Sequence, residues 1–286
     1  MISASTFQLL RFHFSFFLMP VYWFALSQVQ EVVTWHAVLI FFILHVLVYP
    51  SSNGYNSYMD RDTGSIGGVK NPLQPTRQLF YITVLMDLVA LILSAIISWY
   101  FFAGVLLFIA ASRAYSYRGI RLKKYPITGY LTVIVFQGAL VYYIVQHGSN
   151  LNKALDVSVT AMMASSLLIG AFYPLTQIYQ HQQDAEDGIK SISALLGYRG
   201  TFIFAAVIFS IAMVLLALYF GNNLELVQFF NIQILMLPAL VYFLRWMYLV
   251  YNNTGAANFK HTMTMNLIGS ICCNAAFITI FLIEKI

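Results

Sequence analysis

The chain has 286 residues, of which 60% are hydrophobic and only 9% are charged. This composition excludes an ordinary soluble globular protein, in which about a quarter of the residues are charged. The formal net charge of +5 does not indicate nucleic-acid binding, because the basic residues follow the ends of the apolar segments described next. No nucleic-acid partner is therefore expected.

Nine apolar runs follow one another along the chain, and each is long enough to cross a lipid bilayer as a helix. They lie at about 8–28, 33–50, 79–98, 99–115, 127–146, 157–175, 200–220, 226–250 and 262–283. The adjacent residues Cys272 and Cys273 lie inside the last run, where we expect them to pack rather than to bind a metal. The pattern predicts an all-α integral membrane protein with nine transmembrane helices around a central cavity.

The basic residues predict the orientation of these helices. With nine spans, all but two of the 15 Lys and Arg residues lie on the N-terminal side of the membrane or near helix ends that face it, and the two exceptions are Lys153 and Lys285. Loops rich in Lys and Arg stay in the cytoplasm. We therefore expect a multi-pass protein, of a bacterial inner membrane, whose N-terminus and polar loops are cytoplasmic.

One sixteen-residue segment occurs twice, and we refer to residues 49–64 and 173–188 as the first and second acidic copies. Five positions are identical at an offset of 124: Tyr49/Tyr173, Pro50/Pro174, Tyr55/Tyr179, Asp60/Asp184 and Gly64/Gly188. The offset covers four spans, so both copies face the same side of the membrane. Internal repeats in membrane proteins commonly enclose a ligand site. We expect one domain over residues 1–286, with four-helix pseudo-repeats at about 8–125 and 127–250 and a ninth helix added.

The acidic copies carry oxygen ligands in helical register. If each copy continues as a helix, the side chains of each fall on one face: Asn53, Asn56 and Asp60 in the first, and Tyr173, Gln177, Gln180, Asp184 and Asp187 in the second. Asp62 and Glu186 would join these faces only through an unwound turn, which Gly64 and Gly188 permit. Carboxylate and amide oxygens are the ligands that Mg²⁺ prefers. The alternative is that the copies are ordinary solvated helix ends.

A basic loop lies between the two copies, at residues 113–124, and reads RAYSYRGIRLKK. Its five basic residues are typical either of a membrane-topology anchor or of a site that holds phosphate groups. Arg offers a two-pronged fork and Lys a point charge to phosphate oxygens.

Together, these three features resemble the UbiA family of intramembrane prenyltransferases. The family's first motif, N-D-x-x-D-x-x-x-D, is matched here at Asn56 and Asp60, whereas Ser57 and Gly64 replace two acids. Its second motif pairs two acids before G-x-[RK]-[ST] and a short L-G, and the matching residues are Asp184, Asp187, Gly188, Lys190, Ser191, Leu196 and Gly197. The residues Tyr115, Ser116, Arg121, Leu122 and Lys123 are similar to its Y-S-x-x-x-R-L-K signature, with one more residue between Ser116 and Arg121.

The resemblance implies a Mg²⁺-dependent transfer of a prenyl group from a (poly)prenyl diphosphate to a hydrophobic, aromatic acceptor within the membrane. It implies catalytic roles for Asp60, Asp184 and Asp187. The implied metal ligands are Asn56, Asp60, Asp184 and Asp187, with Asp62, Asn53 and Gln180 as further candidates. The implied diphosphate contacts are Tyr115, Ser116, Arg121, Lys123, Lys190 and Arg61. Ser57 and Gly64 leave the number of metal ions open.

Two other functions remain as alternatives, a membrane carrier and a non-catalytic relative of the family. Repeats and an acidic residue inside a span, here Asp87, are also typical of carriers. Against a carrier, the acids lie at one membrane face and the opposite side has few polar groups. Asp87 itself is expected to bond a neighbouring helix, and His13, His36 and His45 to pack. His181 lies near the acidic face, and Arg11 is either a topology anchor or a diphosphate contact.

Overall fold

The computed structural model describes residues 2–285, with side chains described as far as residue 283. Within these residues the chain is helical, and the β contacts are two isolated bridges, between residues 32 and 150 and between residues 66 and 69. Nine of the described helical segments are long and apolar enough to cross a membrane. This confirms the predicted all-α membrane fold.

The first four spans occupy the N-terminal half of the chain. They consist of α1 (Ala4–Leu10), η1 (Phe12–Leu18) and α2 (Met19–Ser27); α3 (Thr34–Phe42), η2 (Ile43–Val48) and α4 (Tyr49–Asp60); α5 (Arg77–Ile97); and α6 (Trp99–Ser116). The second span is longer than predicted, because α4 continues as helix through most of the first acidic copy. The short 3₁₀ turn η3 (Leu122–Lys124) then ends the basic loop.

The last five spans follow the basic loop. They consist of α7 (Pro126–Ile134), η4 (Val135–Leu140) and α8 (Val141–Ser149); α9 (Val159–Gln177); α11 (Ile192–Asn222); α12 (Leu226–Asn252); and α13 (Phe259–Lys285). The short helix α10 (His181–Glu186) and the 3₁₀ turn η5 (Thr254–Ala256) lie in the connections. The seventh span begins at residue 192 rather than 200, and Gly197 interrupts its helical backbone with a φ of 70°.

Two spans contain a π-helical segment, η2 in the second span and η4 in the fifth. In the second span, Pro50 lacks the N–H that would close a regular turn, which favours a widened turn before it. In the fifth span, Gly138 lies against α9, where an added Cβ would come within 2.7 Å of the backbone N of Ser166. The Ser166 hydroxyl accepts a hydrogen bond from the backbone N of Ala139 (3.0 Å). This close packing joins the fifth span to the sixth.

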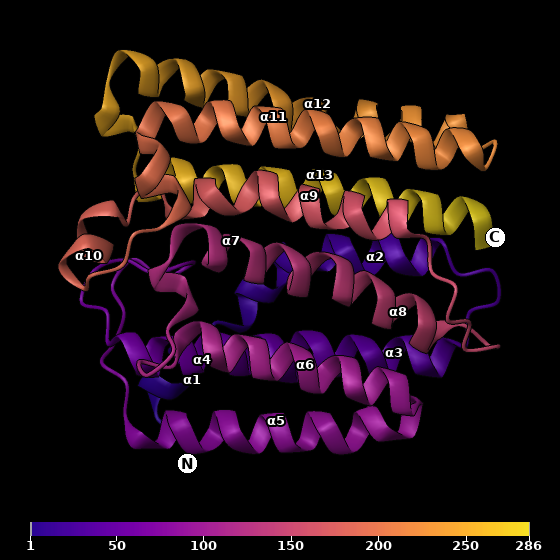
Figure 1. Ribbon diagram of the computed structural model, residues 1–286, viewed down its shortest axis with the longest axis horizontal. Helices are drawn as coiled ribbons and strands as arrows, with labels where there is room; N and C mark the ends of the chain where they lie inside the picture. The colour runs from indigo at the N-terminus through magenta and orange to yellow at the C-terminus, as the bar shows by residue number, and fades with distance from the viewer. Residues whose placement is uncertain (1, 286) are drawn as a thin grey trace.

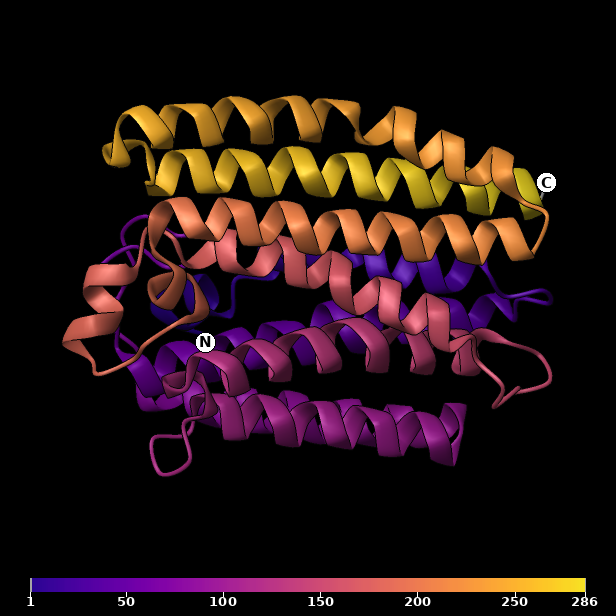
Figure 2. The same ribbon diagram turned by 45° about the horizontal axis from the view of Figure 1, so that its top comes forward.

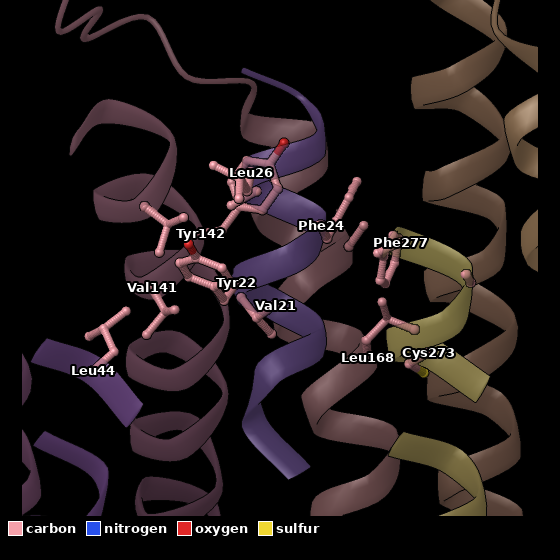
Figure 3. Close-up of a cluster of buried hydrophobic side chains, with 14 of the residues drawn as sticks. Val21, Tyr22, Phe24, Leu26, Leu44, Val141, Tyr142, Leu168, Cys273 and Phe277 are labelled. Atoms are coloured by element: carbon pink, nitrogen blue, oxygen red, sulfur yellow. The ribbon is translucent and has the colours of Figure 1, made fainter. Parts of the chain in front are cut away.

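The spans lie side by side, with α10 and the polar loops at one end of the bundle (left in Figures 1 and 2). The C-terminal end of α13 lies at the other end (Figure 1). Buried aromatic side chains fill the space between the helices, and Figure 3 shows Tyr22, Phe24, Tyr142 and Phe277 among them. The rings of Phe24 and Phe277 are stacked with centroids 4.6 Å apart, which joins α2 to α13.

The outer faces of the bundle are apolar. Large side chains such as Ile92 (67% exposed), Val227 (71%) and Tyr248 (69%) point away from the core. Continuous exposure of such groups is unfavourable in water and natural in hydrocarbon, where the helices satisfy their own backbone hydrogen bonds. The lipid bilayer is therefore the surroundings that this surface fits.

The acidic residue inside the third span has a structural partner. Asp87 is 9% exposed and forms an ion pair with Arg113 on α6. It also accepts a hydrogen bond from Ser51 Oγ on α4 (2.6 Å), and the Arg113 guanidinium lies over the Tyr55 ring (3.9 Å). This buried network ties α4, α5 and α6 together and includes two residues of the first acidic copy, Ser51 and Tyr55. The hydrogen bond between His45 Nδ1 and the Ser15 carbonyl (3.3 Å) likewise joins two helices.

Candidate active site

Both acidic copies line one cavity of about 210 Å³. The cavity lies at the end of the bundle where α4 and α9 finish. Its polar lining residues include Asn53, Asn56, Asp60 and Asp62 of the first copy, Tyr173, Gln177, Gln180, Gln183, Asp184 and Asp187 of the second copy, Tyr115 and Ser116 at the end of α6, and Lys123 in η3. The tertiary structure therefore brings together segments that are more than 120 positions apart.

The first copy is a regular helix up to Asp60. It ends at Arg61, whose left-handed backbone (φ 55°) turns the chain so that Asp62 also lines the cavity. We expected an unwound turn permitted by Gly64, and the turn is instead made three residues earlier by Arg61. Gly64 has a different role, since a Cβ there would lie 2.6 Å from Gln183 Oε1. At the position where the family motif has a third acid, this chain therefore has a glycine that lies against the Gln183 side chain of the second copy.

The second copy does not continue as one helix, which corrects the expectation drawn from its helical register. α9 ends at Gln177, and Asp184 lies on the separate helix α10. The end of α9 tightens because the backbone N–H groups of residues 178 and 180 bond carbonyls three residues back, and Thr176 Oγ1 bonds its own helix at the Tyr173 carbonyl. Tyr173, Gln177, Gln180, Asp184 and Asp187 nevertheless all line the cavity.

Amide side chains join the two copies directly. Gln183 Nε2 donates to Asp62 Oδ1 (2.5 Å), and Gln180 Nε2 donates to the Ser65 carbonyl (3.3 Å). Gln183 was missed by the sequence analysis because it does not fall on the acidic face of an ideal helix. The density of Gln residues between positions 177 and 183 was the signal that could have indicated it.

Hydroxyl and amide groups connect the wall of the cavity to α6. Asn56 Nδ2 donates to Ser116 Oγ (2.9 Å), and one turn earlier the hydroxyls of Ser52 and Ser112 are hydrogen-bonded. The hydroxyls of Tyr115 and Tyr173 are also hydrogen-bonded to each other. These contacts hold α4, α6 and α9 around the cavity in one arrangement.

The basic loop covers the acidic residues. Lys123 Nζ is paired with Asp60, whose side chain is only 5% exposed. Arg121 is paired with Asp187 and lies 3.5 Å from Asp60 Oδ1, so it bridges the two copies. Arg118, more exposed, lies 3.7 Å from Asp187 Oδ1. Cations and carboxylates of the site thus neutralise one another in this structure.

Asp184 takes part in none of the ion pairs found among residues 2–283. Burial raises the pKa of the Asp184 carboxyl to about 7, and the nearby carboxylates of Asp62, Asp60 and Asp187 add to the shift, against Lys123. Burial also raises the pKa of Asp62, again with a contribution from Asp60. Asp184 is therefore a buried carboxyl group of the cavity that lacks an ion-pair partner among the described side chains, which favours the binding of an added cation.

Several other residues suggested by the sequence lie outside the cavity. Arg121 does not line it and approaches it only through its contacts with Asp187 and Asp60. Arg61 and Lys190 are exposed, and neither lines it. His181 stacks on Tyr198 and bonds Ser193 Oγ (2.8 Å), so it supports the loop rather than the cavity.

Arg11, by contrast, lines the cavity and is only 6% exposed. Its guanidinium donates to the carbonyls of Asn53 (3.1 Å) and Gly67 (3.3 Å), and its Nε has no hydrogen-bond partner. The sequence left open whether Arg11 is a topology anchor or a diphosphate contact, and the structure places it on the wall of the cavity.

Comparison with known proteins agrees with this fold. The sequence model of the UbiA prenyltransferase family matches residues 17–268. A UbiA homologue from Archaeoglobus fulgidus bound to GPP and Mg²⁺ superposes with a TM-score of 0.72 at 19% identity, over 98% of this chain and 100% of that one. A UbiA homologue from Aeropyrum pernix K1 gives a TM-score of 0.66 at 17% identity, over 94% and 98%.

A digeranylgeranylglyceryl phosphate synthase shares the fold as well, with a TM-score of 0.62 at 16% identity, over 97% of this chain and 96% of that one. No curated protein matches the sequence. Identities this low show a common fold, whereas the family model covers most of the chain. The chain therefore belongs to the UbiA prenyltransferase family.

Proposed function

We propose that this protein transfers a prenyl group from a (poly)prenyl diphosphate to a lipophilic, aromatic acceptor within the membrane, in a Mg²⁺-dependent reaction. The observation that carries the proposal is the composition of one cavity. Carboxylates from both acidic copies and Lys123 of the basic loop line it together with the aromatic side chains Phe14, Phe108 and Phe136. Such a cavity fits an amphipathic molecule with a charged group at one end and a hydrophobic chain at the other.

The residues present fit Mg²⁺ if the substrate completes its coordination. Among the residues described, no group of three or more His, Cys, Asp or Glu side chains is placed to hold a metal alone. Mg²⁺, however, is commonly bound by one or two carboxylates together with waters and phosphate oxygens. Asp60 Oδ1 is buried and accepts no hydrogen bond. Asn56, Asp60, Asp184 and Asp187 would hold the ion, with Asp62, Asn53 and Gln180 within the same cavity.

When bound, Mg²⁺ would neutralise the charge that develops on the departing diphosphate. The protein's own cations act on the same charge. Lys123 and Arg121 are now paired with carboxylates, and a diphosphate offers them a more strongly charged partner. Re-pairing with phosphate would release Asp60 and Asp187 for the metal. Tyr115, Ser116 and Arg11 line the same region and would donate to phosphate oxygens, and Arg61 and Lys190 would reach it only after movement of their loops.

The apolar part of the cavity protects the reacting carbon. The bond between prenyl C1 and the diphosphate oxygen breaks with its electron pair on the oxygen, and an aromatic carbon of the acceptor supplies the pair for the new bond. The acceptor ring then loses a proton to water. Phe108 and Phe136 would exclude water from the allylic cation and stabilise it through their ring faces.

Relatives with the same fold support this proposal. The Archaeoglobus fulgidus homologue has been solved with GPP and Mg²⁺ and also with DMAPP and Mg²⁺. We further propose that the protein lies in a bacterial inner membrane with its N-terminus and the site loops in the cytoplasm, as the distribution of Lys and Arg indicates. The single domain would consist of pseudo-repeats at about 8–125 and 127–250 followed by the ninth helix.

The direct test is release of diphosphate from GPP by the purified protein in lipid nanodiscs, with a bacterial lipid extract as the source of acceptor. We expect release with Mg²⁺ and none with EDTA. Asp60→Ala and Asp184→Ala should each abolish it, whereas Glu186→Ala removes a carboxylate that points away from the cavity and should not. Unchanged release by the Asp60 and Asp184 variants would disprove the assignment.

A non-catalytic relative is the second candidate, because Asp60 and Asp187 are already neutralised by Lys123 and Arg121. Such a protein would bind GPP without releasing diphosphate in the same assay. A carrier would instead move the substrate across vesicle membranes with its diphosphate intact.

A further inference from the structure

Two exposed cations lie where α12 and α13 meet, at the end of the bundle that holds the acidic cavity. They are Arg245 on α12 and Lys260, the second residue of α13, and we refer to their surroundings as the α12–α13 seam. Figures 1 and 2 show the two helices side by side, with their hairpin at the end where α10 lies. Neither side chain makes an ion pair or a hydrogen bond among residues 2–283, and neither lines the acidic cavity.

Contacts of one histidine fix how the two helices meet at the seam. His261, which follows Lys260 directly, is hydrogen-bonded through Nδ1 to the hydroxyl of Tyr242, one turn before Arg245 (2.9 Å). Its ring also lies nearly parallel to that of Trp246, with centroids 6.3 Å apart. The charges of Lys260 and Arg245 both act on this ring. The two cations therefore flank one fixed group and are presented together to the surroundings of the protein.

Acidic residues are rare in this part of the chain. From residue 188 to residue 283 there is one, Glu225, which lies at the opposite end of α12, about 30 Å from Arg245 along the helix axis. Arg199, a cation of the neighbouring α11, is placed differently, because its guanidinium donates to the Tyr251 carbonyl (2.9 Å) and so satisfies the end of α12. The seam therefore has an excess of positive charge.

Arg245 lies within the membrane-spanning length of α12. It comes seven residues before the end of the helix at Asn252, which is about 10 Å along the axis. Val241 (65% exposed) and Tyr248 (69%) share its face of the helix and point outward as well. A charged side chain that faces lipid at this depth needs an anionic partner, and its long stem lets the guanidinium reach the headgroup layer. Since the described side chains offer no such partner, the lipid is its source.

The surface deeper in the membrane is apolar on both helices of the seam. Below Lys260, Leu267 (48% exposed) and Ile271 (51%) follow on the same face of α13, as Val241 does below Arg245 on α12. The seam thus offers cations at the level of the headgroups and hydrocarbon contacts beneath them. This arrangement matches a diacyl phospholipid, whose phosphate meets the cations while its chains lie along the helices. A soluble phosphate ion would use the cations alone.

We propose that the α12–α13 seam is a binding site for an anionic diacyl phospholipid, whose phosphate accepts a two-pronged contact from Arg245 and a point-charge contact from Lys260. A zwitterionic headgroup fits less well, because it brings a third cation next to these two. Basic sites between membrane helices commonly bind anionic headgroups. The inference does not depend on prenyl transfer, since the seam lies outside the acidic cavity.

The test is a lipid titration of the full-length protein in detergent, followed by native mass spectrometry. Phosphatidylglycerol and phosphatidylcholine with the same acyl chains are compared, and the dissociation constant of the first lipid to bind is measured for each. We expect phosphatidylglycerol to bind about 25-fold more tightly, because each of the two cations contributes about five-fold.

Arg245→Gln and Lys260→Gln should each reduce this preference about five-fold, and the double variant should lose it. Arg245→Lys retains the charge and should keep most of the preference. Arg77→Gln is the matched control, because Arg77 is an exposed arginine in the first turn of α5, at the same end of the bundle but outside the seam. It should leave the preference unchanged. If the double variant does not assemble, the single variants carry the same test.

Equal binding of the two lipids by the unmodified protein, or an unchanged preference in the Arg245→Gln and Lys260→Gln variants, would overturn the proposal. So would displacement of phosphatidylglycerol by an equal concentration of inorganic diphosphate or of GPP, because the seam would then hold a phosphate ion or the prenyl donor. Diphosphate release reports on the acidic cavity and is measured separately. Loss of the lipid preference in the Arg245→Gln and Lys260→Gln variants, with release unchanged, is the expected result.

Discussion

In the first acidic copy, α4 runs without interruption to Asp60, whereas in the second copy α9 stops at Gln177 and Asp184 lies on the separate helix α10. The two segments share five identical positions and line the same cavity. Equivalent side chains are therefore delivered to one site by different backbones. The two copies therefore share the positions of their carboxylates at the cavity but not the path of their backbones.

The two copies also differ in charge. Asp60 is paired with Lys123 and approached by Arg121, whereas Asp184 takes part in no ion pair among the described side chains. Burial and neighbouring carboxylates raise the pKa of Asp184 to about 7. The first copy is therefore neutralised by the protein, and the second has the greater demand for an added cation.

The largest effect is expected when the carboxylate of either copy is removed. Asp60→Asn and Asp184→Asn should each reduce diphosphate release about 10³-fold, because each removes a charge that balances the metal-bound leaving group. If both copies bind the same diphosphate, the rate of diphosphate release in the double variant should be little lower than in either single variant. Steady-state release kinetics of the three variants measure this. A double variant that loses the product of the two single losses would mean that the copies act independently.

The next largest effect is expected from loss of the ion pair between Asp87 and Arg113, which supports α4. Asp87→Asn should lower the free energy of unfolding by about 3 kcal/mol, because it leaves the Arg113 guanidinium buried without its counter-ion. Replacing both partners, as in Asp87→Leu with Arg113→Leu, should cost much less. Unfolding by SDS titration in mixed micelles measures both. If the single and the double variants lose the same free energy of unfolding, the loss comes from the missing ion pair and not from a buried guanidinium without a counter-ion.

Removal of the cation that holds the first copy should have an intermediate effect. Lys123→Met should reduce kcat/KM for GPP about 30-fold, since one charge-assisted contact to the diphosphate is lost. Lys124→Met is the control, because Lys124 is the adjacent residue but is exposed and does not line the cavity. Equal losses from both changes would indicate a general loop effect instead of a contact by Lys123.

The smallest effect concerns pH and separates the two copies most directly. The pKa of Asp184 is raised in the folded protein, so the folded state binds a proton that the unfolded state releases between about pH 4 and 7. Stability of the metal-free protein should therefore fall as pH rises through this window, and Asp62, whose pKa is also raised, adds to the slope. Asp184→Asn should flatten it. Thermal melts in detergent from pH 5 to 8 measure the slope, which should not weaken in Glu186→Gln.

Much of the fold could be predicted from the sequence because membrane spans are local features. A run of apolar residues of sufficient length forms a helix whatever its neighbours, since hydrocarbon offers no other hydrogen-bond partner to the backbone. The copies are four spans apart, and an even number of spans returns the chain to the same membrane face. That parity argument was enough to expect Asp60 and Asp184 near each other.

The tertiary structure alone decided which polar residues meet. The break after Gln177, the turn at Arg61 and the placement of Gln183 beside Asp62 depend on packing between segments far apart in sequence. The same holds for two lysines that fit the family pattern: Lys123 in the basic loop turns inward, whereas Lys190, just beyond the second acidic copy, stays exposed. Hydropathy and spacing set the number and direction of the helices, because these follow from local chemistry. The direction of a side chain in the site follows from its neighbours in space, which a linear pattern does not contain.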